Sequence, residues 1–520
     1  MREIQSISQH KKIINPSGSM KVPVVFHVSD NLMPGEATIQ ELVDIASDPH
    51  VFHHVTALSD VHSKKGRKNP TGTAIATKKY ILPQTMDTAP NCGMRLIKTP
   101  FSTSDLNETQ IDKLFEELVK VIPTTTYVGT RVNFDTVMDV CRRGSRAILE
   151  KLKIDSDEDK YTFNGGNFFS ARGACLLDGQ GSALGGNIPS EKEILNSIPK
   201  TFLRIAQLRL GILGAAGNHF LDLMKVSNII NEEIAQKFGI KKDQYLFLMH
   251  TGSGMLGQYA SYFYTPKEKE HRSQKIILEL GRRQFLKRNN PAHEQLRRDI
   301  PAWKNKKEYY PIDSESELGR MYLTAHRVSA NYGFANRAVL TNNIRKAVKK
   351  VFGREEELPL VYDMPHVHVQ EEEHFGEEVF VHRNGASRAN GPERMKNLLE
   401  LNSRSSEVFA ETGEPIFIPS SMATPFYFGV GTDENESTFF SASHGTGKAK
   451  EKQGNVPQNR EELMEKMKKN KVKLFNAKSR QIIDQDSSHY KDVEEVIAGM
   501  TENKIIKVVA KMQPVAVLMA

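Results

Sequence analysis

The sequence predicts a protein that mixes helices and strands, and three kinds of segment indicate this class. Short apolar runs broken by Pro and Gly, such as Val22 to Val28 and Thr73 to Thr77, are typical of strands joined by loops. Apolar residues at helical spacing run from Glu317 to Lys350 and predict a long amphipathic helix. Between these regions, Asn164 to Gly186 is rich in Gly and Asn, which predicts loops whose backbone can approach a ligand closely.

Further elements follow from the same patterns. We expect helices over three more segments, the last interrupted at Gly211 to Gly217: Thr109 to Val121, Asp135 to Leu152 and Glu191 to Phe238. Short apolar runs predict strands at Tyr245 to Met249 and at Leu360 to Tyr362. The first of these strands delivers His250 into a Gly-containing turn.

The composition is that of a soluble globular protein. Hydrophobic residues make up 38% and charged residues 26% of the 520 residues, which excludes fibrous and mostly disordered classes. Residues 1–30 lack the layout of a secretory signal, and no apolar run approaches the roughly 20 residues that span a bilayer. Cys92, Cys141 and Cys175 are too few and too isolated for a disulfide framework. We therefore expect a cytoplasmic protein, built either as one large core with appended helices or as two domains.

The charge pattern indicates an anionic partner. A net charge of +8 and a pI near 9.0 make nucleic acid the first candidate. The segment 267–308 predicts a basic helical insertion, with Arg282, Arg283, Lys287, Arg288, Arg297 and Arg298. Two interpretations are open, because such a helix with its own Glu residues is typically a solvated face, whereas an RNA backbone needs cationic tracks.

Candidate metal ligands stand beside Gly, Asn or Pro at the ends of apolar runs, where catalytic groups are commonly placed. The strings are Asn91-Cys92-Gly93, Gly217-Asn218-His219-Phe220, His250-Thr251-Gly252-Ser253-Gly254, Asp363-Met364-Pro365-His366 and Ser443-His444-Gly445-Thr446-Gly447. One thiolate with several imidazoles suits Mn, Fe, Co, Ni or Zn. Taken singly, each His is more typical of a hydrogen-bonded structural residue, and Cys92 of a small buried one. No local CxxC or HExxH spacing decides between these interpretations.

Taken together, these strings resemble the RtcB family of RNA ligases, in order from about Asp60 to the carboxyl end. Any one motif is weak, but their ordered co-occurrence is specific. The other matching motifs are Ser59-Asp60-Val61-His62, Asn331-Tyr332-Gly333, Ala335-Asn336-Arg337, Tyr362-Asp363, Val381-His382-Arg383, Gly385-Ala386-Ser387-Arg388-Ala389, Pro419-Ser420-Ser421-Met422 and Tyr490-Lys491-Asp492-Val493.

The resemblance implies a single large α+β domain over residues 1–520, with mixed sheets surrounded by helices and the active site in a central cleft. It implies that Cys92 bridges two Mn²⁺ ions, with His219 completing one site and His250 and His366 the other. His444 would be the nucleophile that attacks the α-phosphate of GTP. The remaining implied roles are support of the active site by Asp60, phosphate binding by Asn218, and nucleotide binding by Phe220, Asp222, Ser421, Lys448 and Tyr490.

The function implied by the resemblance is RNA ligation through a histidine-GMP intermediate. RNA 3′-phosphate or 2′,3′-cyclic phosphate ends would be joined to 5′-hydroxyl ends, in RNA repair or tRNA splicing. The expected partners are GTP and RNA, such as tRNA halves or broken RNA, with no membrane partner. We expect a monomer.

The chain also departs from the family pattern. Ala89 stands where the family has a metal-binding Asp, so either Asp87 supplies the carboxylate or the site lacks one; Pro90, which stiffens the backbone, favours the second. Gly254 replaces an Arg and Met519 a Lys. These losses keep two alternatives open, a metal-dependent phosphodiesterase or phosphatase acting on RNA ends and an inactive RNA-binding paralogue.

Overall fold

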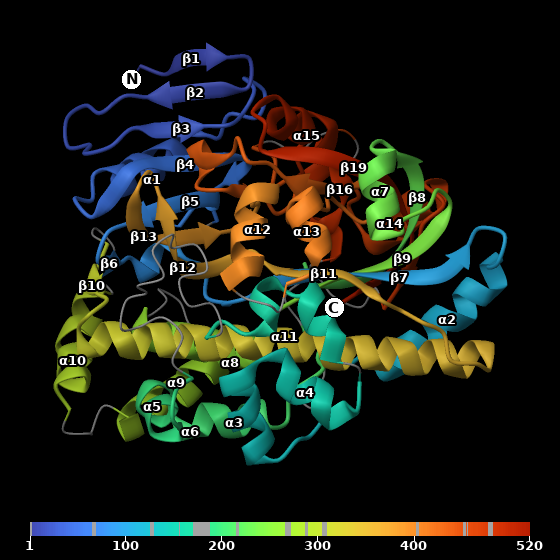
Figure 1. The fold of residues 1–520 in the computed structure, drawn as a ribbon, viewed down its shortest axis with the longest axis horizontal. Coiled ribbons are helices and arrows are strands. Elements are labelled where there is room, and N and C mark those ends of the chain that lie inside the picture. The colour runs from blue at the N-terminus through green and yellow to red at the C-terminus, as the bar shows by residue number, and fades with distance from the viewer. Residues whose placement is uncertain are drawn as a thin grey trace.

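The computed structural model places two large sheets above a layer of helices (Figure 1). Helices and strands contribute apolar residues to the same hydrophobic cores. It describes residues 3–520 except 65–68, 125–128, 155, 170–187, 215–217, 266–271, 286–289, 304–308, 402–404, 451–453, 455 and 477–481. Cys175 and Gly217 lie outside the described residues. Within the described part of the chain, no helix combines the length and apolar character needed to cross a membrane. The expected α+β class is confirmed.

The first sheet has the strand order β1-β2-β3-β4-β5-β13-β12. Its strands pair antiparallel apart from the parallel neighbours β3 and β4. Apolar residues of this sheet pack against α1 and α15. The strands are β1 (Gln5–Ser8), β2 (Lys11–Ile14), β3 (Val24–Phe26), β4 (Val51–His62), β5 (Thr71–Thr77), β12 (Val367–His374) and β13 (Glu377–Asn384).

The second sheet has the order β11-β7-β9-β8-β19-β16-β15, with β18 pairing parallel to β19. Its strands are β7 (Gly93–Ser102), β8 (Phe220–Ile229), β9 (Gln244–Thr251), β11 (Leu360–Pro365), β15 (Pro415–Ile418), β16 (Phe426–Gly431), β18 (Lys473–Phe475) and β19 (Ile506–Met519). Two small sheets pair β6 (Tyr80–Ile81) with β10 (Ile312–Asp313) and β14 (Ala386–Arg388) with β17 (Ser441–Ser443).

The long helix α11 (Glu317–Phe352) lies between the sheets and the helical layer (Figure 1). Ser316 caps its start by accepting a hydrogen bond from the Gly319 N–H, and Gly353 ends it with a φ of 74°. The other helices are α1 (Glu36–Ala46), α2 (Glu108–Val121), α3 (Phe134–Arg143), α4 (Ser145–Leu152), α5 (Glu191–Ser197), α6 (Lys200–Ala206), α7 (Glu232–Phe238), α8 (Gly254–Tyr264), α9 (Arg272–Phe285), α10 (Pro291–Trp303), α12 (Pro392–Leu401), α13 (Glu407–Thr412), α14 (Arg460–Lys469) and α15 (Val493–Glu502).

Two expectations about helices are corrected. The helix expected over Asp135 to Leu152 is divided at Gly144, which has a φ of 63° and where a Cβ would lie 1.9 Å from the Gly166 carbonyl oxygen. The helix expected up to Phe238 is wrong over β8, which pairs with β9 and β19 in the second sheet. Pairing on both sides overrides the local pattern there.

The segment predicted as a basic insertion contains α9 and α10, and three of its arginines lie close to acidic side chains of the same helices. Arg282 is buried and donates to the Tyr262 carbonyl at 3.2 Å. Arg283, Arg297 and Arg298 lie 3.6, 3.8 and 3.1 Å from Glu279, Glu294 and Asp299. Lys287 and Arg288 fall outside the described residues. The described pairs favour a solvated face over an RNA track, and the extent of the insertion stays a prediction.

A buried ion network joins α11 to the second sheet. The Asp363 carboxylate on β11 accepts from Arg95 Nε of β7 at 2.8 Å and from Arg337 Nε of α11 at 2.7 Å. All three side chains are fully buried. Arg337 also donates to both oxygens of Asn91 and to the Thr251 carbonyl, at 2.7 to 3.1 Å. The network therefore holds the main chain next to Cys92 and next to His250.

We predict that Asp363→Asn lowers the free energy of unfolding by about 3–5 kcal/mol, because Arg337 stays buried without a counter-charge and Arg95 keeps only its 3.4 Å contact with Glu158. Urea unfolding followed by circular dichroism measures the loss. The control is Glu434→Gln, which removes an exposed ion pair with Lys504 and should cost no more than about 1 kcal/mol. Equal effects of the two substitutions would show that the buried network does not hold α11 on the sheet.

Candidate active site

The candidate metal ligands meet at one end of the second sheet because neighbouring strands end there in register. Gly93 of β7 pairs with Thr251 of β9 and with Pro365 of β11, and Phe220 of β8 pairs with His250. The ligands occupy these positions or the adjacent ones, namely Cys92, His219, His250 and His366. Strand pairing thereby brings together residues that are up to 274 positions apart in the chain.

The donor atoms of these four residues face one another. Cys92 Sγ lies 3.6 Å from His219 Nε2 and 3.3 Å from His250 Nε2. His250 Nε2 lies 3.3 Å from His366 Nε2. The donors of Cys92, His219 and His250 all lie within 4.8 Å of one another.

Main-chain carbonyls set the tautomers of two of the imidazoles. Nδ1 of His219 lies 2.9 Å from the Leu213 carbonyl oxygen, and Nδ1 of His250 lies 2.8 Å from that of Asn218. A carbonyl can only accept, so each Nδ1 donates and each Nε2 presents a lone pair to the Cys92 sulfur. A cation placed between these converging lone pairs would be coordinated by them.

The electrostatics of the cluster fit a metal ion. Burial lowers the pKa of His219 to about 4 and lowers the pKa values of His250 and His366 well below the usual imidazole value. The rings are therefore neutral near pH 7 and open to coordination. Burial raises the pKa of the Cys92 thiol to about 12, so the thiolate would form only with a bound cation. This buried thiol and imidazole set suits a divalent transition metal.

His444 follows β17 and is oriented by a carboxylate from the first sheet. Its Nδ1 lies 2.8 Å from Asp60 Oδ2, and Asp60 is fully buried at the end of β4. With Asp60 ionised, Nδ1 donates and Nε2 carries the free lone pair. The His444 ring lies 4.5 Å from the His366 ring, between centroids. A nucleophilic nitrogen is thus placed beside the metal-capable cluster.

The loop after His444 closes against β4. Gly447 has a φ of 70°, and a Cβ there would lie 2.2 Å from the Asp60 carbonyl oxygen. Lys491 is buried and donates to the carbonyls of Ser59 and Val61 on either side of Asp60. These contacts fix the main chain on both sides of the Asp60 carboxylate.

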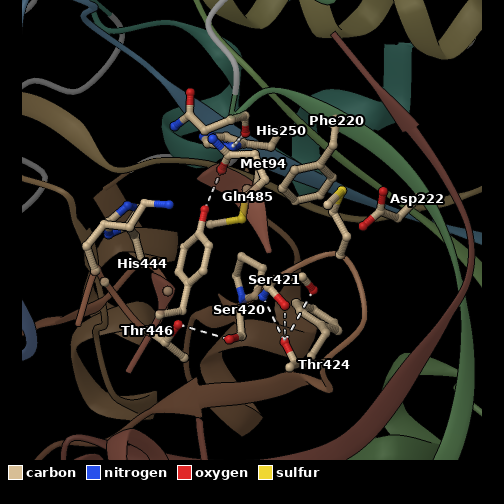
Figure 2. Close-up of a pocket in the computed structure, with 18 of the residues that line it drawn as sticks. Met94, Phe220, Asp222, His250, Ser420, Ser421, Thr424, His444, Thr446 and Gln485 are labelled. Carbon is tan, nitrogen blue, oxygen red and sulfur yellow. Dashed lines mark hydrogen bonds between the residues drawn. The ribbon is translucent and has the colours of Figure 1, made fainter. Parts of the chain in front are cut away.

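A cavity of about 490 Å³ opens in front of His444. Figure 2 shows His444 and Asp222 at opposite sides of it, with Ser421 and Thr424 on a loop between them. All six residues expected to bind the nucleotide line this one cavity: Asn218, Phe220, Asp222, Ser421, Lys448 and Tyr490. Asp222 is buried with Oδ1 lacking a hydrogen-bond partner, and burial raises its pKa well above the usual carboxyl value.

Lys448 supplies positive charge to the wall of the cavity. Its Nζ lies 3.8 Å from the centroid of the Tyr490 ring and donates to the Asp484 carbonyl. Burial lowers the pKa of Lys448 from 10.5 to about 8. The Tyr490 hydroxyl donates to Gln485, which also lines the cavity.

The Asp87 carboxylate, one of the two alternatives left open for the ligand missing at Ala89, is directed to a lysine. Asp87 Oδ2 lies 2.6 Å from Lys64 Nζ, and Oδ1 accepts from the Thr88 N–H at 2.6 Å. Ala89 packs in an apolar group with Cys92, Met86 and Val367. Neither residue belongs to the set of donors gathered at Cys92 within the described residues.

Sequence reasoning missed Lys64 and the roles of Arg337 and Asp363. Lys64 lines the cavity two residues after His62, so the lysines that follow the Asp60-Val61-His62 motif were the available signal. For Arg337 and Asp363 the signal was a charge inside an apolar run. His368, two residues after His366, points away from the cluster: it lies 3.4 Å from Arg383, with its ring against Phe163.

A family model described as tRNA-splicing ligase RtcB matches residues 41–520. The chain belongs to the RtcB family. The metal-capable cluster, the His444–Asp60 pair and the cavity all lie inside the matched region.

RtcB relatives cover nearly the whole chain. A protein named tRNA-splicing ligase RtcB from Nanoarchaeum equitans is 26% identical, covering 99% of both chains. Proteins of the same name from Thermococcus kodakarensis and Methanococcus maripaludis are 26% and 28% identical, covering 96% of this chain and 95% of theirs. Identities this low agree with the departures from the family pattern at Ala89, Gly254 and Met519.

We predict that inorganic triphosphate binds more weakly as the pH rises through about 8, the pKa of Lys448. The ammonium is charged below this pH and neutral above it, so a charge-assisted contact worth roughly tenfold in affinity is lost. Calorimetric titrations from pH 7 to 9.5 measure the change. Lys448→Arg should bind equally well across this range, because a guanidinium stays charged.

Lys491 provides the internal alternative, since burial also lowers its pKa to about 8. A loss of affinity that persists unchanged in Lys448→Arg would therefore assign the effect to Lys491. A wild-type affinity that does not depend on pH would contradict the prediction for both lysines.

Proposed function

We propose that this protein is a GTP- and manganese-dependent RNA ligase that acts through a guanylylated His444. One observation carries the proposal. The lone pair of His444 Nε2 is set by the 2.8 Å contact of Nδ1 with Asp60, at the mouth of a cavity lined by all six expected nucleotide-binding residues. Membership of the RtcB family supports the same activity.

In the first step His444 Nε2 attacks the α-phosphorus of GTP, the P–N bond forms and pyrophosphate leaves. Asp60 needs to carry no proton in this step. It holds the Nδ1 hydrogen and stabilises the positive charge that develops on the ring. Because Asp60 is fully buried, its interaction with His444 is little screened by water.

Cys92, His219, His250 and His366 would hold the metal, which we take to be Mn²⁺ from the family resemblance. When bound, a divalent ion neutralises phosphate charge next to the nucleophile. Asn218, whose carbonyl accepts from His250, lines the cavity and can contact phosphate. Lys448 adds a second positive group on the cavity wall.

The far side of the cavity would bind the guanine base. Asp222 Oδ1 is buried without a hydrogen-bond partner and can pair with donors on the base edge. Phe220 and Tyr490 line the cavity and offer rings for stacking, and Ser421 offers a hydroxyl. The sugar and phosphates would then lie between Asp222 and His444, which Figure 2 shows on opposite sides of the cavity.

In the remaining steps an RNA 3′-phosphate takes the GMP from His444, and a 5′-hydroxyl then displaces GMP to form the phosphodiester bond. A 2′,3′-cyclic phosphate end would first be opened by water. The names of the relatives support tRNA splicing as the setting, with RNA repair as the other use of the same chemistry. We place this activity in the cytoplasm and in a monomer.

A second candidate is a metal-dependent phosphodiesterase or phosphatase acting on RNA ends. The apolar contact of Ala89 with Cys92 favours it, since it removes a carboxylate from the metal-capable cluster. Metal-dependent phosphate release without guanylylation would identify this activity. An inactive RNA-binding paralogue would show neither, but the convergence of four donor residues argues against it.

We predict that incubation with α-labelled GTP and Mn²⁺ labels the protein covalently on a denaturing gel, and that His444→Ala abolishes the label while metal content stays the same. Asp60→Asn should slow labelling by about 10²–10⁴-fold, because the amide no longer fixes the Nδ1–H tautomer. Undiminished labelling of His444→Ala would move the nucleophile elsewhere.

Cys92→Ala should remove metal and covalent labelling together, because a methyl group cannot replace the only thiolate of the cluster. Elemental analysis of the purified variant checks this. Cys141→Ala is the matched control, since Cys141 is buried among apolar residues of the helical layer. Unchanged metal content in Cys92→Ala would contradict the ligand role.

A further inference from the structure

The cluster at Cys92 has few negative charges for a centre of two divalent ions. Among the described residues, the donors that lie within 4.8 Å of one another are one thiol and two imidazoles, with no carboxylate. His366, which adjoins His250, adds another neutral ring. A thiolate contributes a single negative charge, whereas two divalent ions bring four positive ones. Burial makes such an imbalance costly.

The side of Cys92 that faces Ala89 is closed to a further ligand. The Cys92 N–H donates to the Ala89 carbonyl at 2.8 Å, which forms a tight turn, and Ala89 packs against the apolar group that contains Cys92. Met86 and Val367 complete this apolar group. Hard and borderline cations need oxygen, nitrogen or sulfur donors, and methyl groups offer none.

The nearest acid along the chain is committed elsewhere. Asp87 Oδ2 pairs with Lys64 Nζ at 2.6 Å, and Oδ1 accepts from the Thr88 N–H at 2.6 Å. The Asp87 N–H donates to Asn384 at 2.9 Å, which fixes the main chain at this point. Asp87 therefore acts as an anchor for the Lys64 ammonium.

Lys64 lies where a second positive charge would be useful. It lines the same cavity as Asn218, His250 and His444, and 39% of its side chain is exposed. Its partner Asp87 holds the ammonium beside this cavity, with Asp87 Oδ2 and Lys64 Nζ 2.6 Å apart. An anion entering the cavity would thus meet the Lys64 ammonium, which Asp87 holds in place.

The donor spacing fits one ion. Bond lengths typical of tetrahedral sites place neighbouring sulfur and nitrogen ligands about 3.5 Å apart and neighbouring nitrogens about 3.3 Å apart. The observed values are 3.3 and 3.6 Å for the sulfur–nitrogen pairs and 3.3 Å for His250 with His366. A single ion can therefore bind between Cys92, His219 and His250, whereas His366 adjoins His250 and lies outside this group of three.

We propose that this centre holds one divalent ion, on Cys92, His219 and His250 with His366 adjoining, and that the Lys64 ammonium takes the place of a second ion in binding phosphate. The proposal rests on the metal role assigned under the proposed function. It replaces the two ions implied by the family resemblance with one ion and one side chain that this chain itself supplies.

Metal counting tests the stoichiometry. The full-length protein is loaded with Mn²⁺, freed of excess metal and analysed for Mn per chain. We expect one equivalent in the wild type and two in the double variant Ala89→Asp/Lys64→Met, which restores a carboxylate and removes the competing ammonium. Two equivalents in the wild type, or one in a double variant that unfolds at the wild-type temperature, would overturn the proposal.

Phosphate binding tests the role of Lys64. Calorimetry with inorganic tripolyphosphate on the Mn²⁺-loaded protein should show binding about tenfold or more weaker in Lys64→Met, and near wild-type binding in Lys64→Arg. Lys120→Met is the matched control, because Lys120 is an exposed residue on α2, with 66% of its side chain accessible. Wild-type affinity in Lys64→Met would overturn the assignment.

These measurements separate the proposal from the ligase activity. If the wild type binds one Mn²⁺ and loses tripolyphosphate affinity with Lys64→Met, the centre is as proposed even when no guanylylated protein forms. Conversely, a guanylylated wild-type protein with two Mn²⁺ ions keeps the proposed function and overturns the single-ion centre.

Discussion

The buried pairing of Asp363 with Arg95 and Arg337 is the interaction on which the site depends. It joins β11, β7 and α11 in a part of the fold where no water can replace a lost partner. Arg337 also anchors the residues next to Cys92 and His250, because it donates to the main-chain carbonyls of Asn91 and Thr251. A buried ion pair of this kind adds little net stability but strongly disfavours any arrangement that separates its members. The ends of the strands are held together for that reason.

Within the site held by this network, hydrogen bonds decide which ring nitrogen of each histidine faces the cluster and the cavity. The carbonyls of Leu213 and Asn218 accept hydrogen bonds from Nδ1 of His219 and His250. The Asp60 carboxylate accepts one from Nδ1 of His444. Each ring therefore presents Nε2 to the reaction space. His219 and His250 have neutral carbonyl acceptors, which suit the proposed role of metal ligand. Of these three rings only His444 has a carboxylate partner, which can stabilise positive charge on the ring of the proposed nucleophile.

The site lies between two sheets, which explains how it combines a buried cluster with an open cavity. The second sheet contributes the cluster, Phe220 and Asp222, while β4 of the first sheet contributes Asp60. His444 directly follows β17 of the small β14–β17 sheet, which is joined to the cluster where the His366 carbonyl accepts from the Ala386 N–H at 3.0 Å. Positive side chains at Lys64 and Lys448 line the cavity and favour an anionic ligand.

The sequence by itself determined the long helix from Glu317, the strand that ends at His250, and the residues that gather around Cys92 and His444, because ordered motifs and local periodicity carry that information. It did not determine β8, whose strand form comes from pairing with β9 and β19. Nor did the sequence decide whether Asp87 supplies the carboxylate that is missing at Ala89. Only the tertiary structure decided this, because Asp87 pairs with Lys64, 23 residues away in the chain. Such a pairing depends on how two loops pack in space, and no local pattern of residues encodes it.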